Sequence, residues 1–114
     1  MYANFLTTEK PIYAVIDHAG SGDNTLVAAV AGFKIRVLSI TLVSGGTVTV
    51  RFESAASGTA LTGQMQLTAQ AGFSSGYSPV GHFETISGEL LNLELGGAVS
   101  VDGFLTYQLI RASR

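Results

Sequence analysis

The stretch that most constrains the fold is residues 33–54, FKIRVLSITLVSGGTVTVRFES, where apolar and polar side chains alternate on both sides of two glycines. In its second half, the apolar positions are Val48, Val50 and Phe52, and the positions expected to face water are Thr47, Thr49, Arg51 and Glu53. A period of two places apolar side chains on one face of a strand. The Gly45-Gly46 dipeptide can supply positive φ at no steric cost. We therefore predict two strands joined as a hairpin by a tight turn at these glycines.

The first half of this stretch contains a change in alternation. Up to Val37 the apolar residues fall on odd positions, and from Leu38 to Leu42 they fall on even positions. Such a change indicates a β-bulge, or a bend where a strand passes from one sheet to another. We predict this irregularity at Val37-Leu38.

Turn residues divide the rest of the chain into further short alternating segments. We predict strands at residues 12–19, 25–30, 61–67, 82–86, 89–95 and 98–110. We predict loops at residues 20–24, 55–58 and 69–81. In the strand at 89–95, the side chains expected inward are Leu91, Leu93 and Leu95, and those expected outward are Asn92 and Glu94. In the last strand, Gly103 lies on the apolar face and indicates a bend or the close approach of a neighbour.

About eight short strands without a long helix are typical of a two-sheet sandwich or a barrel. We predict an all-β, jelly-roll-like sandwich over residues 11–114, preceded by a leader or arm at residues 1–10. An immunoglobulin-like sandwich is the second possibility, although the Cys-Trp-Cys pattern of that fold is absent.

Charge is scarce in this chain, because Asp, Glu, Lys and Arg make up only 12% of its 114 residues, compared with about 25% in a typical domain. A surface covered by copies or partners suits such a composition, but so does a small neutral β-domain. The net charge is −2 and the longest basic cluster is the Lys34/Arg36 pair, so we expect no nucleic-acid partner. Charged residues interrupt the apolar run at 26–43, so we expect no membrane span. The absence of cysteine excludes disulfides and thiolate metal sites.

Catalytic and metal-binding motifs are also scarce. His18 and His82 are far apart in the sequence, and neither belongs to a metal-ligand spacing. Asp17 and His18 are adjacent on a predicted strand, so their side chains point to opposite faces and cannot pair. The glycine-rich loop at 20–24 lacks the Lys-Ser or Lys-Thr of a phosphate-binding loop, and Asp17 and Asp23 supply too few oxygens for calcium. We predict no enzyme activity, no cofactor and no metal.

Aromatic residues on loops are the best candidates for a binding surface. Phe73 and Tyr77 lie in the predicted 69–81 loop, close to His82, although the commoner use of a lone loop phenylalanine such as Phe73 is as a plug that closes one end of the sandwich. The leader is either a disordered tail or an extended arm that docks its apolar residues on a neighbour. The predicted partner contacts are Tyr2, Phe5, Leu6, Phe73 and Tyr77.

Three phrases carry a resemblance that spans residues 20–110, most of the chain: GDNTLVAAVAGFKIRVLSITLV, TVTVRFESAASGTALTG and GHFETISGELLNLELGGAVSVDGFLTYQLI. Together they resemble a group of small proteins found among the structural genes of tailed bacteriophages. The leader and the 69–81 stretch match that group least. The phrases are strand-and-turn patterns rather than catalytic motifs.

The resemblance implies a virion structural protein, namely a decoration (cement) protein that binds the major capsid protein on the outer surface of the assembled head. It further implies a homo-oligomer, with a trimer favoured. A receptor- or carbohydrate-binding module of a head fibre or tail is the alternative, with Phe73, Tyr77 and Tyr107 stacking on sugar rings. A small lytic or processing enzyme of the virion is the third reading.

Overall fold

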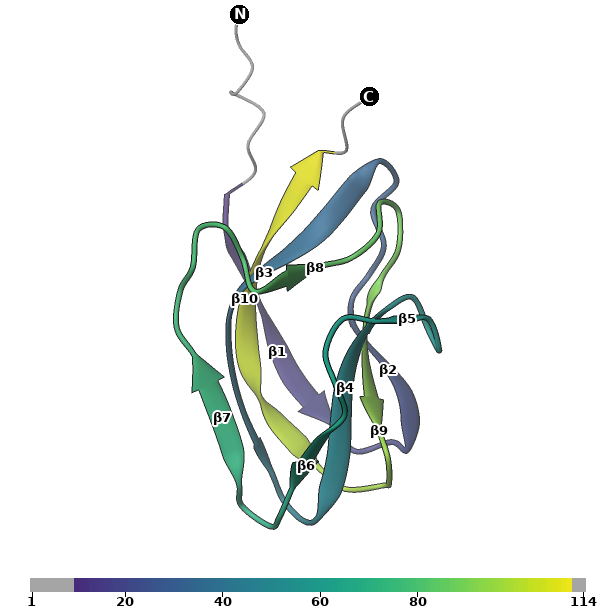
Figure 1. The fold of residues 1–114 in the computed structure, drawn as a ribbon, viewed down its shortest axis with the longest axis vertical. Coiled ribbons are helices and arrows are strands. Elements are labelled where there is room, and N and C mark those ends of the chain that lie inside the picture. The colour runs from purple at the N-terminus through teal and green to yellow at the C-terminus, as the bar shows by residue number, and fades with distance from the viewer. Residues whose placement is uncertain (1–9, 112–114) are drawn as a thin grey trace, which may run out of the picture.

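The computed structural model describes residues 10–111, which form ten strands (Figure 1). The strands are β1 (Ile12–His18), β2 (Gly22–Val27), β3 (Phe33–Ser44), β4 (Val48–Ser54), β5 (Thr59–Ala60), β6 (Met65–Leu67), β7 (Gly72–Ser75), β8 (Phe83–Glu84), β9 (Leu91–Leu95) and β10 (Val101–Arg111). Within this part of the chain, no helix is long and apolar enough to cross a membrane.

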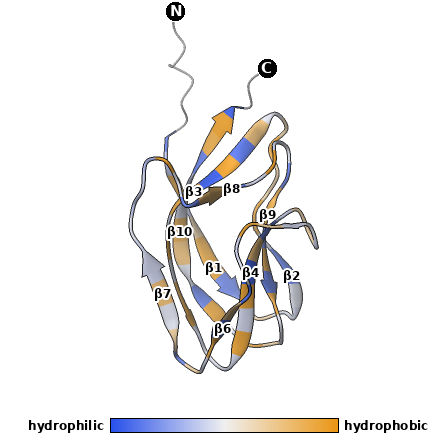
Figure 2. Cartoon of the chain, in the orientation of Figure 1, coloured by the Kyte–Doolittle hydropathy of each residue, from blue (hydrophilic) through white to orange (hydrophobic). Residues whose placement is uncertain are grey.

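The strands form two antiparallel sheets that pack face to face. Sheet A has the order β1-β10-β3-β7, with β8 also paired to β3, and sheet B has the order β2-β9-β4-β5, with β6 also paired to β4. Figure 2 shows hydrophobic and hydrophilic residues alternating along the longer strands, as expected when each sheet has one face on the core.

The pairing pattern is that of a jelly roll. β1 pairs with β10, β2 with β9, β3 with β7 and β8, and β4 with β5 and β6. The chain therefore folds back on itself as one long hairpin, whose tip is the turn between β4 and β5. Because β1, β2, β3 and β4 alternate between the sheets, this hairpin wraps into two layers. The predicted all-β sandwich is confirmed, with ten strands rather than about eight.

The predicted hairpin between β3 and β4 is wrong, because these strands lie in different sheets. The backbone N–H of Gly45 donates to Ser100 O (2.7 Å), and neither Gly45 nor Gly46 has the positive φ of a tight hairpin turn. Alternation specifies that each strand has an apolar face, but it does not specify the strand beside it. Here the apolar faces of β3 and β4 are buried against each other across the core, which requires one strand in each sheet.

The predicted irregularity at Val37-Leu38 is confirmed. Ser39 lies opposite Thr106 and Val37 lies opposite Tyr107, so Leu38 is an extra residue on β3. Val37 and Leu38 are both fully buried. This β-bulge lets β3 keep an apolar inner face on both sides of the change in alternation.

The core contains the inward side chains of both sheets, and Phe52 is among the largest that are fully buried. Its ring lies 5.3 Å from the ring of Phe83, centroid to centroid. The predicted inward faces of β4 and β9 are confirmed, because Val48, Val50, Phe52, Leu91, Leu93 and Leu95 all belong to the buried cluster. The predicted outward faces are only partly right, because Glu53 and Asn92 are also buried.

Several predicted boundaries are also wrong. The second strand spans Gly22–Val27 instead of 25–30, and the 61–67 segment is strand only at β6. Residues 72–75, part of the predicted 69–81 loop, form β7, which pairs with Ile40–Val43 of β3. A strand with this polar, glycine-containing sequence is stable here because β3 offers an unpaired edge. Gly72 permits the close approach, since a Cβ at this position would collide with the carbonyl oxygen of Leu42.

Candidate partner-binding site

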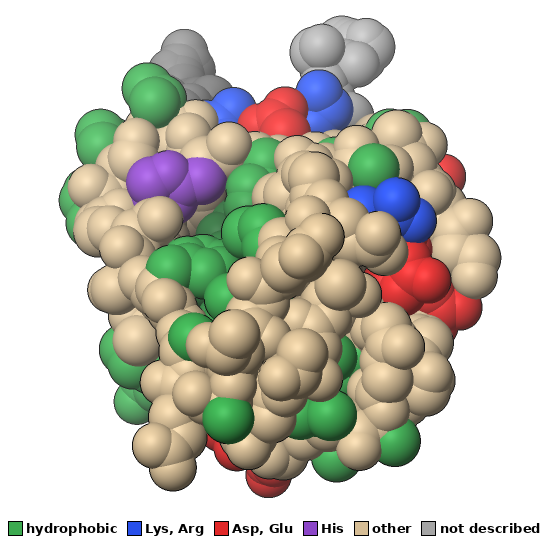
Figure 3. Space-filling model, turned by 60° about the horizontal axis from the view of Figure 1, so that its bottom comes forward, with side chains coloured by type: hydrophobic (Ala, Val, Ile, Leu, Met, Phe, Trp, Pro, Cys, Tyr) green, Lys and Arg blue, Asp and Glu red, His purple; other side chains and the backbone are tan. Residues whose placement is uncertain are grey.

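An apolar groove opens between the two sheets where their edges are not joined. β7 lies at the edge of sheet A and β6 pairs only with β4 of sheet B. The groove has a volume of about 240 Å³ and is lined by Ile40, Phe52, Thr62, Met65, Phe73, Ser75, His82 and Phe83. Figure 3 shows hydrophobic side chains in a hollow beside a histidine on this face of the molecule. We call this feature the open-edge groove.

The floor and walls of the groove follow from strand alternation. Phe52 and Ile40 point inward from β4 and β3 and form the part nearest the core. Phe73 on β7 lies opposite Leu42 and shares its inward face. Because β7 and β6 are short and belong to different sheets, nothing in residues 10–111 closes the space between them.

The loop between β7 and β8 borders the groove. The Nε2 atom of His82 lies 2.7 Å from Gly76 O, a contact that ties the two ends of the loop together. The backbone N–H of Ser78 donates to Leu38 O (2.9 Å), which anchors the middle of the loop on β3. Tyr77 and Val80 remain 66% and 77% exposed. The loop is thus fixed at several points while it presents large apolar side chains to solvent.

The structure places the predicted contact residues in different environments. Phe73 lines the groove and packs partly against the core, and its role as a partner contact stays a prediction. Tyr77 is exposed on the neighbouring loop. Tyr107 is partly buried and packs against the core from β10. The other predicted contacts, Tyr2, Phe5 and Leu6, lie outside the described residues.

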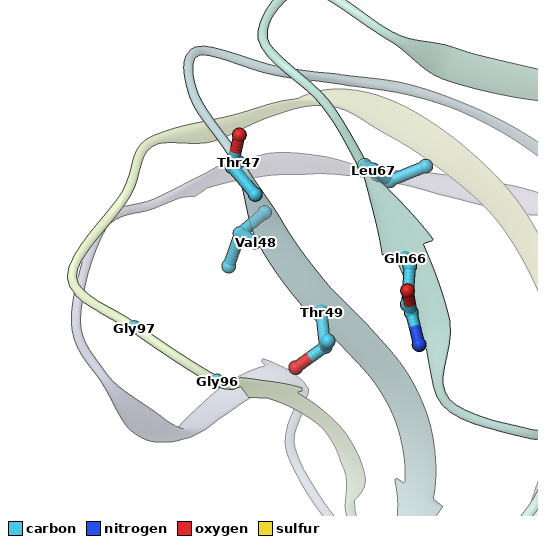
Figure 4. A pocket seen from close by; sticks show the side chains of 7 residues that line it. All are labelled: Thr47, Val48, Thr49, Gln66, Leu67, Gly96 and Gly97. Carbon is cyan, nitrogen blue, oxygen red and sulfur yellow. The ribbon is translucent and has the colours of Figure 1, made fainter.

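A second, more polar depression lies beside the start of β4 (Figure 4). Its volume is about 270 Å³, and its lining residues are Thr47, Val48, Thr49, Gln66, Leu67, Gly96 and Gly97. The Thr49 side chain points toward Gly96, whose backbone N–H donates to Thr49 O (2.9 Å). The depression offers hydroxyl and amide groups but no aromatic ring on which a sugar would stack.

A network of polar and charged side chains crosses the outer face of sheet B. Arg51 donates to Glu53 Oε2 (2.6 Å) and to Glu94 Oε1 (2.9 Å). The Asn92 side-chain amide donates to Glu53 Oε1 and to Asp23 Oδ1, both at 2.8 Å. The Glu53 side chain is only 1% exposed, so its carboxylate depends on these partners for the hydrogen bonds that water would otherwise supply.

The two glutamates of this network have pKa values shifted in opposite directions. Burial raises the pKa of Glu53, but hydrogen bonds from Glu94, Arg51 and Asn92 outweigh burial and hold it below its ordinary value. The pKa of Glu94 is raised, first by its hydrogen bond to Glu53 and then by burial. Glu94 therefore holds a proton more readily than Glu53.

Two neighbouring carboxyl groups whose pKa values are shifted apart can act as acid and base in an enzyme. Here, however, no member of the network lines the open-edge groove or the depression beside β4. We interpret the network as structural, because it connects the side chains of β2, β9 and β4. Sequence reasoning missed it because Asn92 and Glu53 occupy positions whose alternation indicates exposure.

The histidines and acidic residues do not assemble a metal site in the described part of the chain. Residues 10–111 contain no group of three or more His, Cys, Asp or Glu side chains placed to hold a metal ion. Asp17 lies directly opposite Asp102 on β10, and its neighbour His18 lies opposite Val101.

No family model, no curated protein and no solved structure matches the chain.

Proposed function

We propose that this chain is a bacteriophage capsid-decoration protein that binds the outer surface of an assembled head through the open-edge groove and the β7–β8 loop. The observation that carries the proposal is an apolar groove lined in part by His82, at the end of a loop that is anchored to β3 and exposes two large side chains, Tyr77 and Val80. Apolar surface of this kind on a charge-poor domain is typical of a protein–protein contact.

The size of the groove favours a side chain of a protein partner over a free ligand. Its volume of about 240 Å³ is below the roughly 300–1,000 Å³ of most small-molecule sites. An aromatic or aliphatic side chain of the capsid subunit would contact Phe52, Phe73 and Phe83 there. A buried apolar anchor of this type supplies a large share of the affinity in many interfaces.

The edge of sheet A adds a second mode of attachment beside the groove. β7 pairs with β3 on one side, and no strand of residues 10–111 pairs with its other side. An extended segment of the capsid subunit would add to this edge by main-chain hydrogen bonds, while its side chains enter the groove. The proposed partner is thus the major capsid protein, the proposed location is the virion surface, and the proposed role is to stabilise the shell without catalysis or a cofactor.

Co-sedimentation with the heads of the phage that encodes the chain tests this proposal. We expect saturable binding to expanded, DNA-free heads and none to unassembled capsid subunit. Tyr77→Ala and Val80→Ser should each weaken head binding, because both remove exposed apolar surface from the β7–β8 loop. Val30→Ser is the matched control, since Val30 is an exposed valine on the β2–β3 loop.

Each remaining outcome has a defined meaning. Equal loss in the Val30 variant and the two loop variants would show that the effect is not specific to the groove. Binding to neither heads nor subunit would overturn the decoration proposal and favour the receptor- or carbohydrate-binding alternative, which a glycan array would then test.

A further inference from the structure

The outer face of sheet A is a second surface with unusual chemistry. It consists of the side chains of β1, β10 and β3 that point away from the core, and we call it the outer sheet-A face. Val15 of β1 lies directly opposite Phe104 of β10, two residues from the Ser39–Thr106 pair at the middle of the face. These side chains are 67% and 47% exposed, and Tyr13 and Val43 are exposed beside them. Four large apolar side chains thus lie together on one open sheet surface.

The hydroxyl groups on this face are already paired with one another. Ser39 Oγ and Thr106 Oγ1 are 2.6 Å apart, and Thr41 Oγ1 and Ser74 Oγ are 2.9 Å apart. A partner that covers these residues would therefore leave none of the four hydroxyls without a hydrogen bond. Water can therefore be removed from this part of the face at little cost in free energy.

The two ends of the face carry opposite charge. At one end Asp17 and Asp102 lie opposite each other on neighbouring strands, and neither makes an ion pair within residues 10–111. Like charges in directly opposed positions destabilise a sheet. At the other end Lys34 and Arg36 share one carboxylate, that of Glu84, at 3.3 and 2.9 Å. One end thus has two negative charges without an ion-pair partner, and the other has one positive charge in excess.

We propose that the outer sheet-A face binds a second copy of this chain about a two-fold axis that crosses the strands at the Ser39–Thr106 pair. On β10, Asp102 lies four residues before Thr106, and Ile110, the partner of Lys34, lies four residues after it. Both ends are therefore about 14 Å from the axis. A half-turn about the axis places the acidic end of one copy over the basic end of the other. Tyr13, which lies opposite Thr106 at the axis, faces Tyr13 of the other copy, and Phe104 of each copy lies over Gln108 of the other.

The charges of this arrangement are self-complementary, as a two-fold interface requires. The face measures roughly 27 Å along β10 and 14 Å across three strands, or on the order of 400 Å² in projection. Stable interfaces bury about 800 Å² per partner. We therefore infer a reversible dimer that forms at high local concentration, in contrast to the trimer that the phage resemblance implies. This inference does not depend on the capsid partner proposed above.

A charge-swap experiment with the full chain tests the geometry. Sedimentation velocity over a range of concentrations should show wild-type dimers. Asp102→Lys and Lys34→Glu should each weaken self-association by ~tenfold or more, because each places like charges at both ends of the interface. An equimolar mixture of the two variants should regain wild-type association, because the lysine introduced at position 102 of one copy then faces the glutamate introduced at position 34 of the other.

Two controls distinguish an effect on self-association from an effect on folding. The lysine introduced by Asp102→Lys would lie opposite Asp17 of its own chain, so circular dichroism should show that this variant is folded. Thr25→Lys, an exposed substitution on β2 of sheet B, should leave association unchanged. A wild-type monomer at all concentrations would overturn the proposal. A dimer or trimer insensitive to both charge substitutions, or a mixture that fails to restore association, would overturn it equally.

Discussion

Phe52 illustrates how much of this fold rests on single inward side chains. It is fully buried, packs on Phe83 at the floor of the open-edge groove and belongs to the continuous core of both sheets. We expect Phe52→Ala to lower the free energy of unfolding by about 3–5 kcal/mol, the range found when a core aromatic is truncated. Urea unfolding monitored by circular dichroism would measure this change. A loss below about 1 kcal/mol would mean that the ring contributes little to the core.

The glutamate pair of the sheet B network should respond to pH in opposite ways. The lowered pKa of Glu53 means that its charged form stabilises the fold above the unfolded pKa of about 4.3, and that this stabilisation is lost as pH falls. Glu53→Gln should therefore cost about 3 kcal/mol at pH 7, and the difference from wild type should close below about pH 4.

Glu94 is the matched control within the same network. Its raised pKa means that the folded state favours the protonated form, so ionisation of Glu94 reduces stability as pH rises above its unfolded pKa. Glu94→Gln resembles the protonated acid and should leave stability at pH 7 equal to or above that of wild type. Equal destabilisation by the Glu53 and Glu94 substitutions, measured by urea unfolding at several pH values, would contradict the assigned pKa directions.

At the scale of elements, the close contact between β10 and β3 depends on a missing side chain. Gly103 has φ of 155°, and a Cβ there would collide with the Thr41 carbonyl oxygen and lie 2.7 Å from Leu42 Cα. Both are backbone atoms, so the contact can be relieved only if the strands separate. The prediction of a close approach at this glycine is confirmed.

Gly103→Ala should accordingly destabilise the protein by about 2 kcal/mol or more, because it forces these two long strands apart. Gly97→Ala is the control, since no atom lies within 4 Å of a Cβ at that position and its φ is not positive. The control should change stability by less than about 0.5 kcal/mol. Thermal unfolding of both variants would measure the difference, and similar melting temperatures would show that the strands adjust freely.

At the scale of the whole molecule, we expect the sandwich to fold without the predicted arm. Both sheets and the core are complete within residues 10–111. Deletion of residues 1–10 should therefore leave a cooperatively folding domain. If the leader anchors the protein on a capsid, the deletion should also weaken binding to heads. Unchanged co-sedimentation after the deletion would exclude the leader as an anchor and leave the open-edge groove as the proposed contact.

Local patterns predict the features that depend on a single strand. Alternation places Val50, Phe52 and Leu93 inward, and the parity change locates the bulge at Leu38. Alternation fails where exposure depends on neighbouring segments. Asn92 occupies an outward position but is buried, because its amide bridges Asp23 and Glu53 on the two adjacent strands. The sequence predicts a loop around Phe73, because this segment has no strand pattern and forms β7 only by pairing with β3.

The sequence by itself determined that this chain is all-β, that its strands have one apolar face, and where β3 is irregular, because period-two patterning and turn residues act over a few neighbouring positions. Only the tertiary structure decided which strands share a sheet. It separated β3 from β4 across the core, left the groove open between β6 and β7, and gathered Val15 and Phe104 on one outer face. These features depend on pairing between segments distant in the chain, and burial of all the apolar faces at once selects that pairing.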